Sequence, residues 1–340
     1  MRKITLPIYK ECNITSDKIC SFPFREMDIK SDGSIYCCAW STACIGNIQL
    51  NTAKEIWHGE LANEVRQSVV EKNYKFCKGD QCPWLNSPHE KGTPFVDSSP
   101  ELTDVPEIVN AAYDKTCNMF CNSCRMFLLV DEDNRQRHEF LRQKIEDIGH
   151  VKELILIGFG DPFSSPHTRK WMSEGINIAD KITIWSNGIL LKSMWHTLSP
   201  ITKKAIYSIE ISIDAATPET YNRIRCGGDW NVLMESMQFI SELRSSGQIQ
   251  NFRINFVVRA ENYTEILDFI DLGNRFGVDD IYFSRMEDWG SISCNCVANF
   301  QVHKKTHKNH DEFLKIMEKA KKKDSKVRFG NLNVSTNVTS

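Results

Sequence analysis

The 340-residue sequence predicts an α/β fold in which an all-parallel sheet or barrel follows a small cysteine-rich module. Short apolar runs alternate with amphipathic stretches beyond about residue 105, which is the pattern of successive βα units. Seven cysteines lie between residues 12 and 82, and a segment rich in Pro, Gly and Ser at 86–100 follows them. We therefore expect a module with its linker over 1–100, a larger domain over 101–330 and a flexible tail over 331–340.

The predicted strands are short and apolar, as buried parallel strands are. The first is expected within 108–116, and the others at 152–158, 181–185, 208–213, 252–258 and 280–283. The predicted helices carry apolar residues at helical spacing and lie at 135–148, 166–179, 192–204, 231–246, 262–275 and 310–323. Because chemistry gathers at the C-terminal ends of parallel strands, the segments that follow these runs are the candidate site.

Composition excludes several classes of protein. The chain is 41% hydrophobic and 25% charged, which is ordinary for a globular domain and unlike a disordered chain. The formal net charge of −2 provides no general field for nucleic acid or for an anionic membrane. No apolar run reaches the ~18 residues of a membrane-spanning helix, and the first residues lack the apolar core of an export signal. We therefore expect a cytoplasmic protein with neither nucleic acid nor membrane as a partner.

The cysteine count is unusual for such a chain. Thirteen is an odd number, and thiols stay reduced in the cytoplasm, so metal or redox chemistry is the expected use. Cys117, Cys121 and Cys124 fall within eight residues, directly after the first predicted strand, and no other cysteine follows within 80 residues. Three thiolates at this spacing hold a [4Fe–4S] cluster and leave one iron open, whereas a partial zinc site or unrelated thiols are the alternatives.

The segment Asp114-Lys-Thr-Cys-Asn-Met-Phe-Cys-Asn-Ser-Cys124 resembles the cluster loop of the radical S-adenosylmethionine (SAM) superfamily. Gly158-Phe-Gly-Asp-Pro162, Ser186-Asn-Gly188 and the stretch 209–228 resemble the family's second, third and fourth strand ends. The resemblance covers roughly 105–330 and implies a partial (β/α)6 TIM-like barrel. Ser123 departs from the pattern, because the family often has an aromatic residue there.

The resemblance also implies a SAM site and a chemistry. The residues expected to bind the cofactor are Gly158, Gly160, Asp161, Ser186, Asn187, Ser212, Asp214 and Arg225, with Arg223 as the alternative to the last. Glycine lets main-chain carbonyls approach the ammonium group, and a guanidinium favours the carboxylate through a charge-assisted bond. One electron from the reduced cluster would cleave SAM and yield a 5′-deoxyadenosyl radical that abstracts a substrate hydrogen atom.

The N-terminal module resembles the SPASM/twitch type of auxiliary-cluster module, although it precedes the barrel where most such modules follow it. Cys20, Cys38, Cys77 and Cys82 would then ligate one auxiliary [4Fe–4S] cluster. Cys37 competes with Cys38 in the doublet, and a structural zinc ion is the alternative to the cluster. A turn at Asp32-Gly33 is expected to reverse the chain, and a helix over 55–71 to return it to Cys77.

The expected function is therefore a radical SAM enzyme of oxidoreductase or isomerase type. Its outcome would be oxidation, epimerisation or bond formation, with a flavodoxin- or ferredoxin-type protein as the electron donor. Only 19 residues precede Cys20, too few for a leader-binding domain, which favours a small-molecule or carbohydrate substrate, or a peptide that a partner protein presents. A peptide or protein maturase of the same superfamily and a non-catalytic iron–sulfur carrier or scaffold are the alternatives. Cys294 and Cys296, which follow the sixth strand, could donate a hydrogen atom to a substrate radical, and a loop with two free thiols is the alternative.

Overall fold

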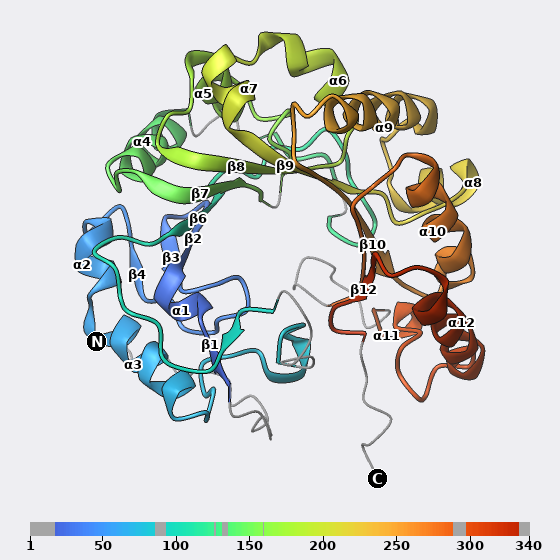
Figure 1. Ribbon diagram of the computed structural model, residues 1–340, viewed down its shortest axis with the longest axis horizontal. Coiled ribbons are helices and arrows are strands. Elements are labelled where there is room, and N and C mark those ends of the chain that lie inside the picture. Colours follow the sequence, from blue (N-terminus) through green and yellow to red (C-terminus); the bar gives the residue numbers. More distant parts are fainter. Residues whose placement is uncertain are drawn as a thin grey trace.

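A single curved sheet of ten strands forms the centre of the molecule, in the order β12-β11-β10-β9-β8-β7-β6-β2-β3-β4. The computed structural model describes residues 18–85, 93–125, 127–130, 135–158, 160–287 and 297–332. Figure 1 shows the sheet bent into an open arc, with helices along its outer side. Cys294 and Cys296 lie outside the described residues.

The six strands expected from the sequence all form, and each pairs in parallel with the next in chain order. They are β6 (Ile108–Ala112), β7 (Val151–Leu156), β8 (Ala179–Ser186), β9 (Ile206–Ser212), β10 (Asn251–Val258) and β11 (Asp280–Arg285). The expected partial barrel of parallel strands is thereby confirmed, although the complete sheet is mostly and not entirely parallel. The first strand ends at Ala112 and is shorter than expected, so the chain from Tyr113 onward is loop.

Two further parallel strands extend the barrel sheet at its edges. Strand β12 (Val327–Phe329) pairs with β11, and β2 (Glu26–Lys30) from the cysteine-rich module pairs with β6. The module adds β3 (Ser34–Tyr36) and β4 (Gly46–Asn47) antiparallel to β2 and to each other. The module is therefore a continuation of the barrel sheet.

The chain reverses between β2 and β3 at the expected turn. Gly33 has a φ of +78°, a conformation that favours glycine because it has no Cβ. The remaining strands of the module are β1 (Ile19–Cys20) and β5 (Phe95–Val96), which form a separate antiparallel pair.

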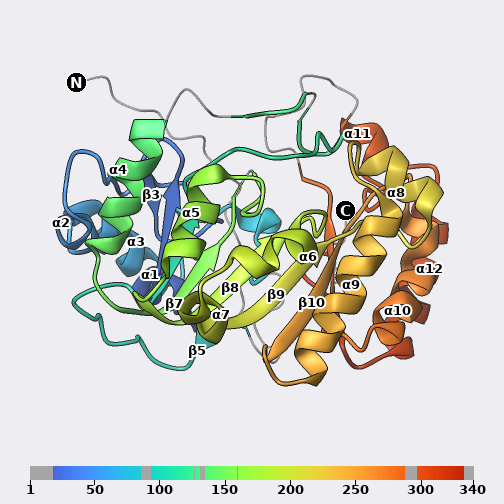
Figure 2. The ribbon, with the colours of Figure 1, turned by 90° about the horizontal axis from the view of Figure 1, so that it is seen from above.

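The helices lie outside the arc, as Figures 1 and 2 show. Those between barrel strands are α4 (Arg135–Glu146), α5 (Pro166–Glu174), α6 (Leu191–Met194), α7 (Pro200–Ala205), α8 (Pro218–Ile224), α9 (Trp230–Ser245) and α10 (Ile266–Arg275), and α11 (Val297–Phe300) and α12 (His310–Lys323) follow β11. The module contributes α1 (Phe22–Arg25), α2 (Ala53–Trp57) and α3 (Glu60–Val70). No helix of the described residues is both long enough and apolar enough to cross a membrane.

Two of the expected helices are interrupted. The stretch 192–204 divides into α6, a 3₁₀ turn and α7, because the Ser199 side chain caps a new helix that begins at Pro200. The stretch 55–71 divides at Gly59, which stands at the N-cap of α3. In both cases a capping residue restarts the helix where the periodicity alone predicts continuity.

The two faces of the barrel sheet differ in chemistry. On the outer face Ile254 and Ile281 approach Gly273 of α10, and both are fully buried. Side chains alternate between faces along a strand, so Arg253 and Asp280 point to the concave inner face. Bulky branched residues fill the usual barrel interior, whereas this one carries charged residues.

Arg253 joins three strands on the inner face. Its Nη1 lies 3.1 Å from Glu210 Oε2 on β9, and its Nη2 lies 2.7 Å from Asp280 Oδ2 on β11. Burial raises the pKa of Glu210, and the neighbouring arginine offsets only part of that shift. A buried carboxylate of this kind depends on its cation.

The open side of the arc is bridged by a contact between the two ends of the fold. Asn331, just after β12, donates from Nδ2 to the carbonyl of Gln81, 3.2 Å away in the module. Its Oδ1 accepts from the backbone N–H of Arg285 at 2.9 Å. The segment between Cys77 and Cys82 is thus held against the last barrel strands.

Replacing Arg253 by Met should lower the free energy of unfolding by about 3 kcal/mol, because buried Glu210 loses this cation and Asp280 is left with the half-exposed Arg328. Urea denaturation of the anaerobically prepared protein measures this loss. Arg244→Met is the matched control, since Arg244 pairs with Asp279 at 2.7 Å but both side chains are about one-third exposed (34% and 31%). We expect that control to lose less than about 1 kcal/mol. Equal losses in the two variants would contradict the assigned role of Arg253.

Candidate functional site

A cavity of about 170 Å³ lies at the C-terminal ends of the barrel strands. Its lining joins five separate segments of the chain: the loop after β6, the ends of β7, β8 and β9, and the segment after α8. The lining residues are Cys117, Met119, Cys121, Cys124, Arg125, Ile157, Gly158, Gly160, Trp185, Ser186, Asn187, Ser212 and Arg225. Of the expected cluster and SAM residues in the barrel, only Asp161 and Asp214 are absent from this lining.

The loop that carries the cysteine triplet is held by backbone hydrogen bonds. The N–H of Cys117 donates to the carbonyl of Leu129 at 3.0 Å, and a turn joins Cys124 to Cys121 at 2.9 Å. The N–H of Phe120 donates to the carbonyl of Cys226, just after α8, at 3.0 Å. In Figure 2 the teal segment with the triplet runs along one end of the strands, on the side of α8 and α11.

The loop after β7 packs directly on the triplet loop, backbone against backbone. A Cβ added at Gly160 would stand 2.3 Å from the carbonyl oxygen of Thr116, so only glycine fits this contact. The same oxygen accepts from the backbone N–H of Asp161 at 2.8 Å. The glycine therefore serves the packing of two loops at the cavity.

The side chain of Asp161 turns into the protein. One carboxylate oxygen accepts from the hydroxyl of Ser186 and the backbone N–H of Asn187, both at 2.8 Å, and the other accepts from the N–H of Phe163 at 2.9 Å. Burial raises the pKa of Asp161, and these donors offset part of the shift. The carboxylate thus joins the ends of β7 and β8, and its backbone remains beside the cavity.

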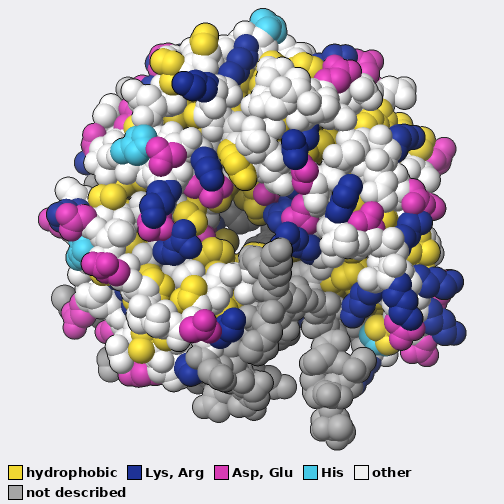
Figure 3. Space-filling view, viewed as in Figure 1, with side chains coloured by type: hydrophobic (Ala, Val, Ile, Leu, Met, Phe, Trp, Pro, Cys, Tyr) yellow, Lys and Arg dark blue, Asp and Glu magenta, His cyan; other side chains and the backbone are white. Residues whose placement is uncertain are grey.

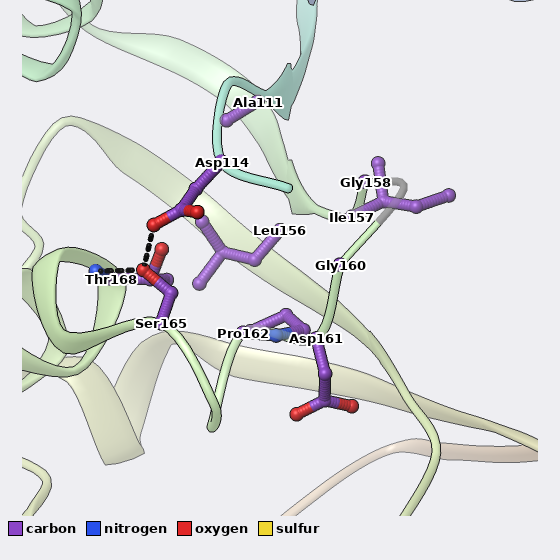
Figure 4. A pocket seen from close by; sticks show the side chains of 10 residues that line it. All are labelled: Ala111, Asp114, Leu156, Ile157, Gly158, Gly160, Asp161, Pro162, Ser165 and Thr168. Carbon is purple, nitrogen blue, oxygen red and sulfur yellow. Dashed lines mark hydrogen bonds between the residues drawn. The ribbon is translucent and has the colours of Figure 1, made fainter. Parts of the chain in front are cut away.

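Asp114 anchors the start of the triplet loop and was missed by the functional reading of the sequence. Its carboxylate accepts from the backbone N–H of Thr116 at 2.8 Å and from the hydroxyl of Ser165. Ser165 in turn caps α5 through the N–H of Thr168, as Figure 4 shows. These residues line a small neighbouring pocket of about 10 Å³, the space of about one water molecule. A Ser-Pro helix start at 165–166 was the available signal.

Asp214 and Arg225 form an ion pair behind the cavity wall. Asp214 has a φ of +62°, and its Oδ2 lies 2.8 Å from Nη2 of Arg225. Its Oδ1 accepts from the N–H of Val257 at 2.8 Å. Arg225 lines the cavity, whereas Arg223 donates to the carbonyl of Glu261 at 2.9 Å. This geometry favours Arg225 as the cavity cation.

Every thiol of the triplet has a side-chain N–H donor beside it. Nη1 of Arg225 lies 3.7 Å from Sγ of Cys121, and Nη2 of Arg125 lies 3.7 Å from Sγ of Cys124. Nδ2 of Asn187 lies 3.9 Å from Sγ of Cys117. Burial, and then the charge of Asp161, raise the pKa of Cys117 to about 11, so a metal must displace a proton to bind there.

A second group of cysteines surrounds a small hydrophobic cluster in the module. Cys82 belongs to this cluster, and Cys20 and Cys77 pack against it. The backbone of Cys77 also pairs with that of Ser41, just after the cysteine doublet, in an isolated antiparallel β-bridge. The sequence segments at 20, 38–41 and 77–82 therefore meet at one place.

The two cysteines of the doublet point to different surroundings. Burial is the main reason that the pKa of Cys38 is raised well above its usual value. The charges of Glu26, Cys77, Cys20 and Cys82 raise this pKa further. Cys38 is therefore close to the other three cysteines of the expected set.

Cys37, in contrast, belongs to the large barrel core. Burial raises its pKa to about 12, and the nearest charges that act on it are those of Arg66 and Glu26. Within the described residues no disulfide joins any cysteines, and no three His, Cys, Asp or Glu side chains converge as for a single metal ion.

Comparison with known proteins gives one family match, and no curated protein matches the chain. Two solved structures with similarity are Streptococcus suis SuiB bound to S-adenosylmethionine and TYW1 with a lysine-pyruvate adduct. SuiB has 17% identity and a TM-score of 0.45, and the match covers 66% of this chain and 50% of SuiB. TYW1 has 18% identity and a TM-score of 0.41, with 64% and 74% covered. The match thus spans about half the length of SuiB.

The family match falls on the cysteine-rich module. Residues 20–83 match the model of SPASM, an iron–sulfur cluster-binding domain. The range begins at Cys20 and ends just after Cys82, so it contains all four cysteines of the expected ligand set. This match confirms the SPASM-type module expected from the sequence.

Proposed function

We propose that the chain is a radical SAM enzyme that cleaves S-adenosylmethionine reductively at a [4Fe–4S] cluster held by Cys117, Cys121 and Cys124. The carrying observation is that these three cysteines line one cavity with residues from three strand ends of the parallel sheet. Three thiolates leave one iron without a protein ligand, and the same cavity offers the cofactor a place beside it.

The surroundings of the three thiols suit such a cluster. Thiolate-bound iron–sulfur clusters are stabilised by hydrogen bonds to their sulfur atoms. Arg125, Arg225 and Asn187 each place an N–H group within 4 Å of one sulfur. These three cysteines would hold the cluster, which when reduced would supply the electron for cleaving SAM to methionine and a 5′-deoxyadenosyl radical that abstracts a substrate hydrogen atom.

The chain's own residues would orient the cofactor. Arg225 lines the cavity with a guanidinium whose Nε is buried without a hydrogen-bond partner in the described residues, which suits a carboxylate. Backbone carbonyls near Gly158 and Gly160 would accept from the ammonium group. Ser186, Asn187 and Ser212 complete the polar wall. Asp161 and Asp214 act through their neighbours, because they hold Asn187 and Arg225 in place.

The SPASM module would hold one auxiliary [4Fe–4S] cluster through Cys20, Cys38, Cys77 and Cys82. The charges of the other three cysteines act on Cys38, which supports this set over one that contains Cys37. Four thiolates leave no open iron, so this cluster would relay an electron from the substrate radical, as an oxidation needs. A flavodoxin- or ferredoxin-type protein would supply the first electron.

The inner face of the sheet indicates the kind of substrate. In addition to Arg253, this face carries two further glutamates. Glu26 accepts a hydrogen bond from Asn110 at 2.6 Å, and Glu153 accepts one from Thr183 at 2.6 Å. Figure 3, which looks down the arc, shows a hollow near the centre of the molecule with acidic and basic side chains intermixed around it. We therefore propose a polar substrate rich in hydroxyl, amide or amino groups, either a carbohydrate-like small molecule or a peptide.

After anaerobic reconstitution with iron and sulfide, we expect reductant-dependent release of 5′-deoxyadenosine from SAM. Cys117→Ala should abolish this release, because two thiolates cannot hold the cluster. The matched control is Cys44→Ala, since Cys44 is exposed and its thiol donates to the carbonyl of Gly46, away from the triplet. Chromatography of the nucleoside products measures both. A wild-type protein that carries its clusters and releases no 5′-deoxyadenosine would refute the proposed activity and leave an iron–sulfur carrier.

The auxiliary ligand set is tested by metal content. Cys38→Ala should lose about four iron atoms per chain, the content of one [4Fe–4S] cluster, whereas Cys37→Ala should keep them. Elemental analysis measures iron and zinc together, so zinc in the wild-type module would appear directly. Loss of iron from Cys37→Ala alone would reverse the assignment of the doublet.

A further inference from the structure

The three cavity thiols lie beside N–H donors of different charge. Cys117 faces the neutral amide of Asn187, but Cys121 and Cys124 each face a guanidinium, those of Arg225 and Arg125. Two positive charges therefore stand beside two of the three sulfurs. The proposed cofactor needs at most one cation for its carboxylate, so its binding alone does not account for the second.

Arg125 is fixed against the triplet loop. Its backbone N–H donates to the carbonyl of Cys121 at 3.0 Å, and its Nη1 donates to the carbonyl of Lys115 at 3.0 Å. The second bond directs Nη2 of the same fork toward Cys124. The position of this charge is set by the loop that carries the thiols.

Arg225 is fixed from the opposite side of the cavity. Its backbone N–H donates to the carbonyl of Tyr221 at 2.7 Å, at the end of α8. Nη2 pairs with Asp214, which leaves Nη1 toward Cys121. The side chain is 12% exposed, so solvent screens its charge weakly.

A cation close to a cluster favours the reduced form. When the oxidised cluster accepts one electron from an external one-electron reductant, its charge becomes one unit more negative and no proton needs to move. Positive charge and N–H donors at the sulfurs stabilise that added charge and raise the reduction potential. A neutral amide such as that of Asn187 has a smaller effect.

We propose that Arg125 and Arg225 are positioning residues that raise the reduction potential of the three-cysteine cluster through their contacts with Cys124 and Cys121. This inference rests on the proposed cluster, but it concerns the electron-accepting step and is independent of SAM turnover. Arg225 would then affect the reduction potential of the cluster in addition to its proposed contact with the cofactor. Arg125, which has no proposed role in cofactor binding, would affect the reduction potential alone.

The test is a potentiometric titration of reconstituted protein followed by electron paramagnetic resonance, without SAM. The signal of the three-cysteine cluster is the one that Cys117→Ala removes. Arg125→Met and Arg225→Met should each move its midpoint to a more negative potential. We expect about a tenfold change in the reduction equilibrium, which is ~59 mV for one electron. Arg125→Lys and Arg225→Lys keep the charge and should recover part of the shift.

The matched control is Arg223→Met, two residues before Arg225. The Arg223 guanidinium donates to the carbonyl of Glu261 and to Thr220. The midpoint potential of the cluster in Arg223→Met should therefore equal that of the wild type. A shift in Arg223→Met as large as in Arg225→Met would show a general charge effect and overturn the assigned contacts. If Arg225→Met fails to load iron, Arg225→Lys and Arg125→Met decide, and unchanged midpoints in both overturn the proposal.

The outcomes separate this inference from the proposed function. Shifted midpoints in a protein that never cleaves SAM would support the role of the arginines and refute the enzyme. SAM cleavage by the wild type with unchanged midpoints in all four arginine variants would support the enzyme and refute this role.

Discussion

Strand β6 pairs in parallel with β2 on one side and with β7 on the other, and this double pairing places both cysteine groups. The triplet loop starts where β6 ends, and the loop after β7 packs on it through the close contact of Gly160 with Thr116. The cysteine-rich module is fixed to the same strand through β2. The triplet loop and the cysteine doublet therefore both follow strands of one continuous sheet, whereas Cys20 lies in the separate pair of β1 and β5.

The polar inner face is the second constraint on function. A barrel filled with branched apolar residues has no room for a substrate, whereas charged residues on the concave face keep the interior polar. The charged residues on this face also stabilise the sheet, because Arg253 and its two carboxylate partners hold three strands together.

Much of the fold was predictable, because the periodicity of apolar residues and the positions of turn-forming residues are local features of the sequence. The strands at 151–156, 206–212 and 251–258 lie within about two residues of their expected bounds. Helix continuity was wrong at Gly59 and Ser199, because a cap outweighs a weak periodicity. The parallel pairing of β2 with β6 and the edge strand β12 were missed, since pairing between segments distant in sequence leaves no periodic trace.

The sequence alone determined the triplet spacing, the alternation of strands and helices, and the family of the module, because each depends on neighbouring residues. Only the tertiary structure could place Cys38 close to the other three cysteines of the expected set, and Arg225 in place of Arg223 at the cavity. Adjacent or nearly adjacent side chains point in different directions, and the packing of remote segments decides which one reaches a site. For the same reason Asp161 turned out to join two strand ends with its carboxylate, where the motif suggested only a cofactor contact.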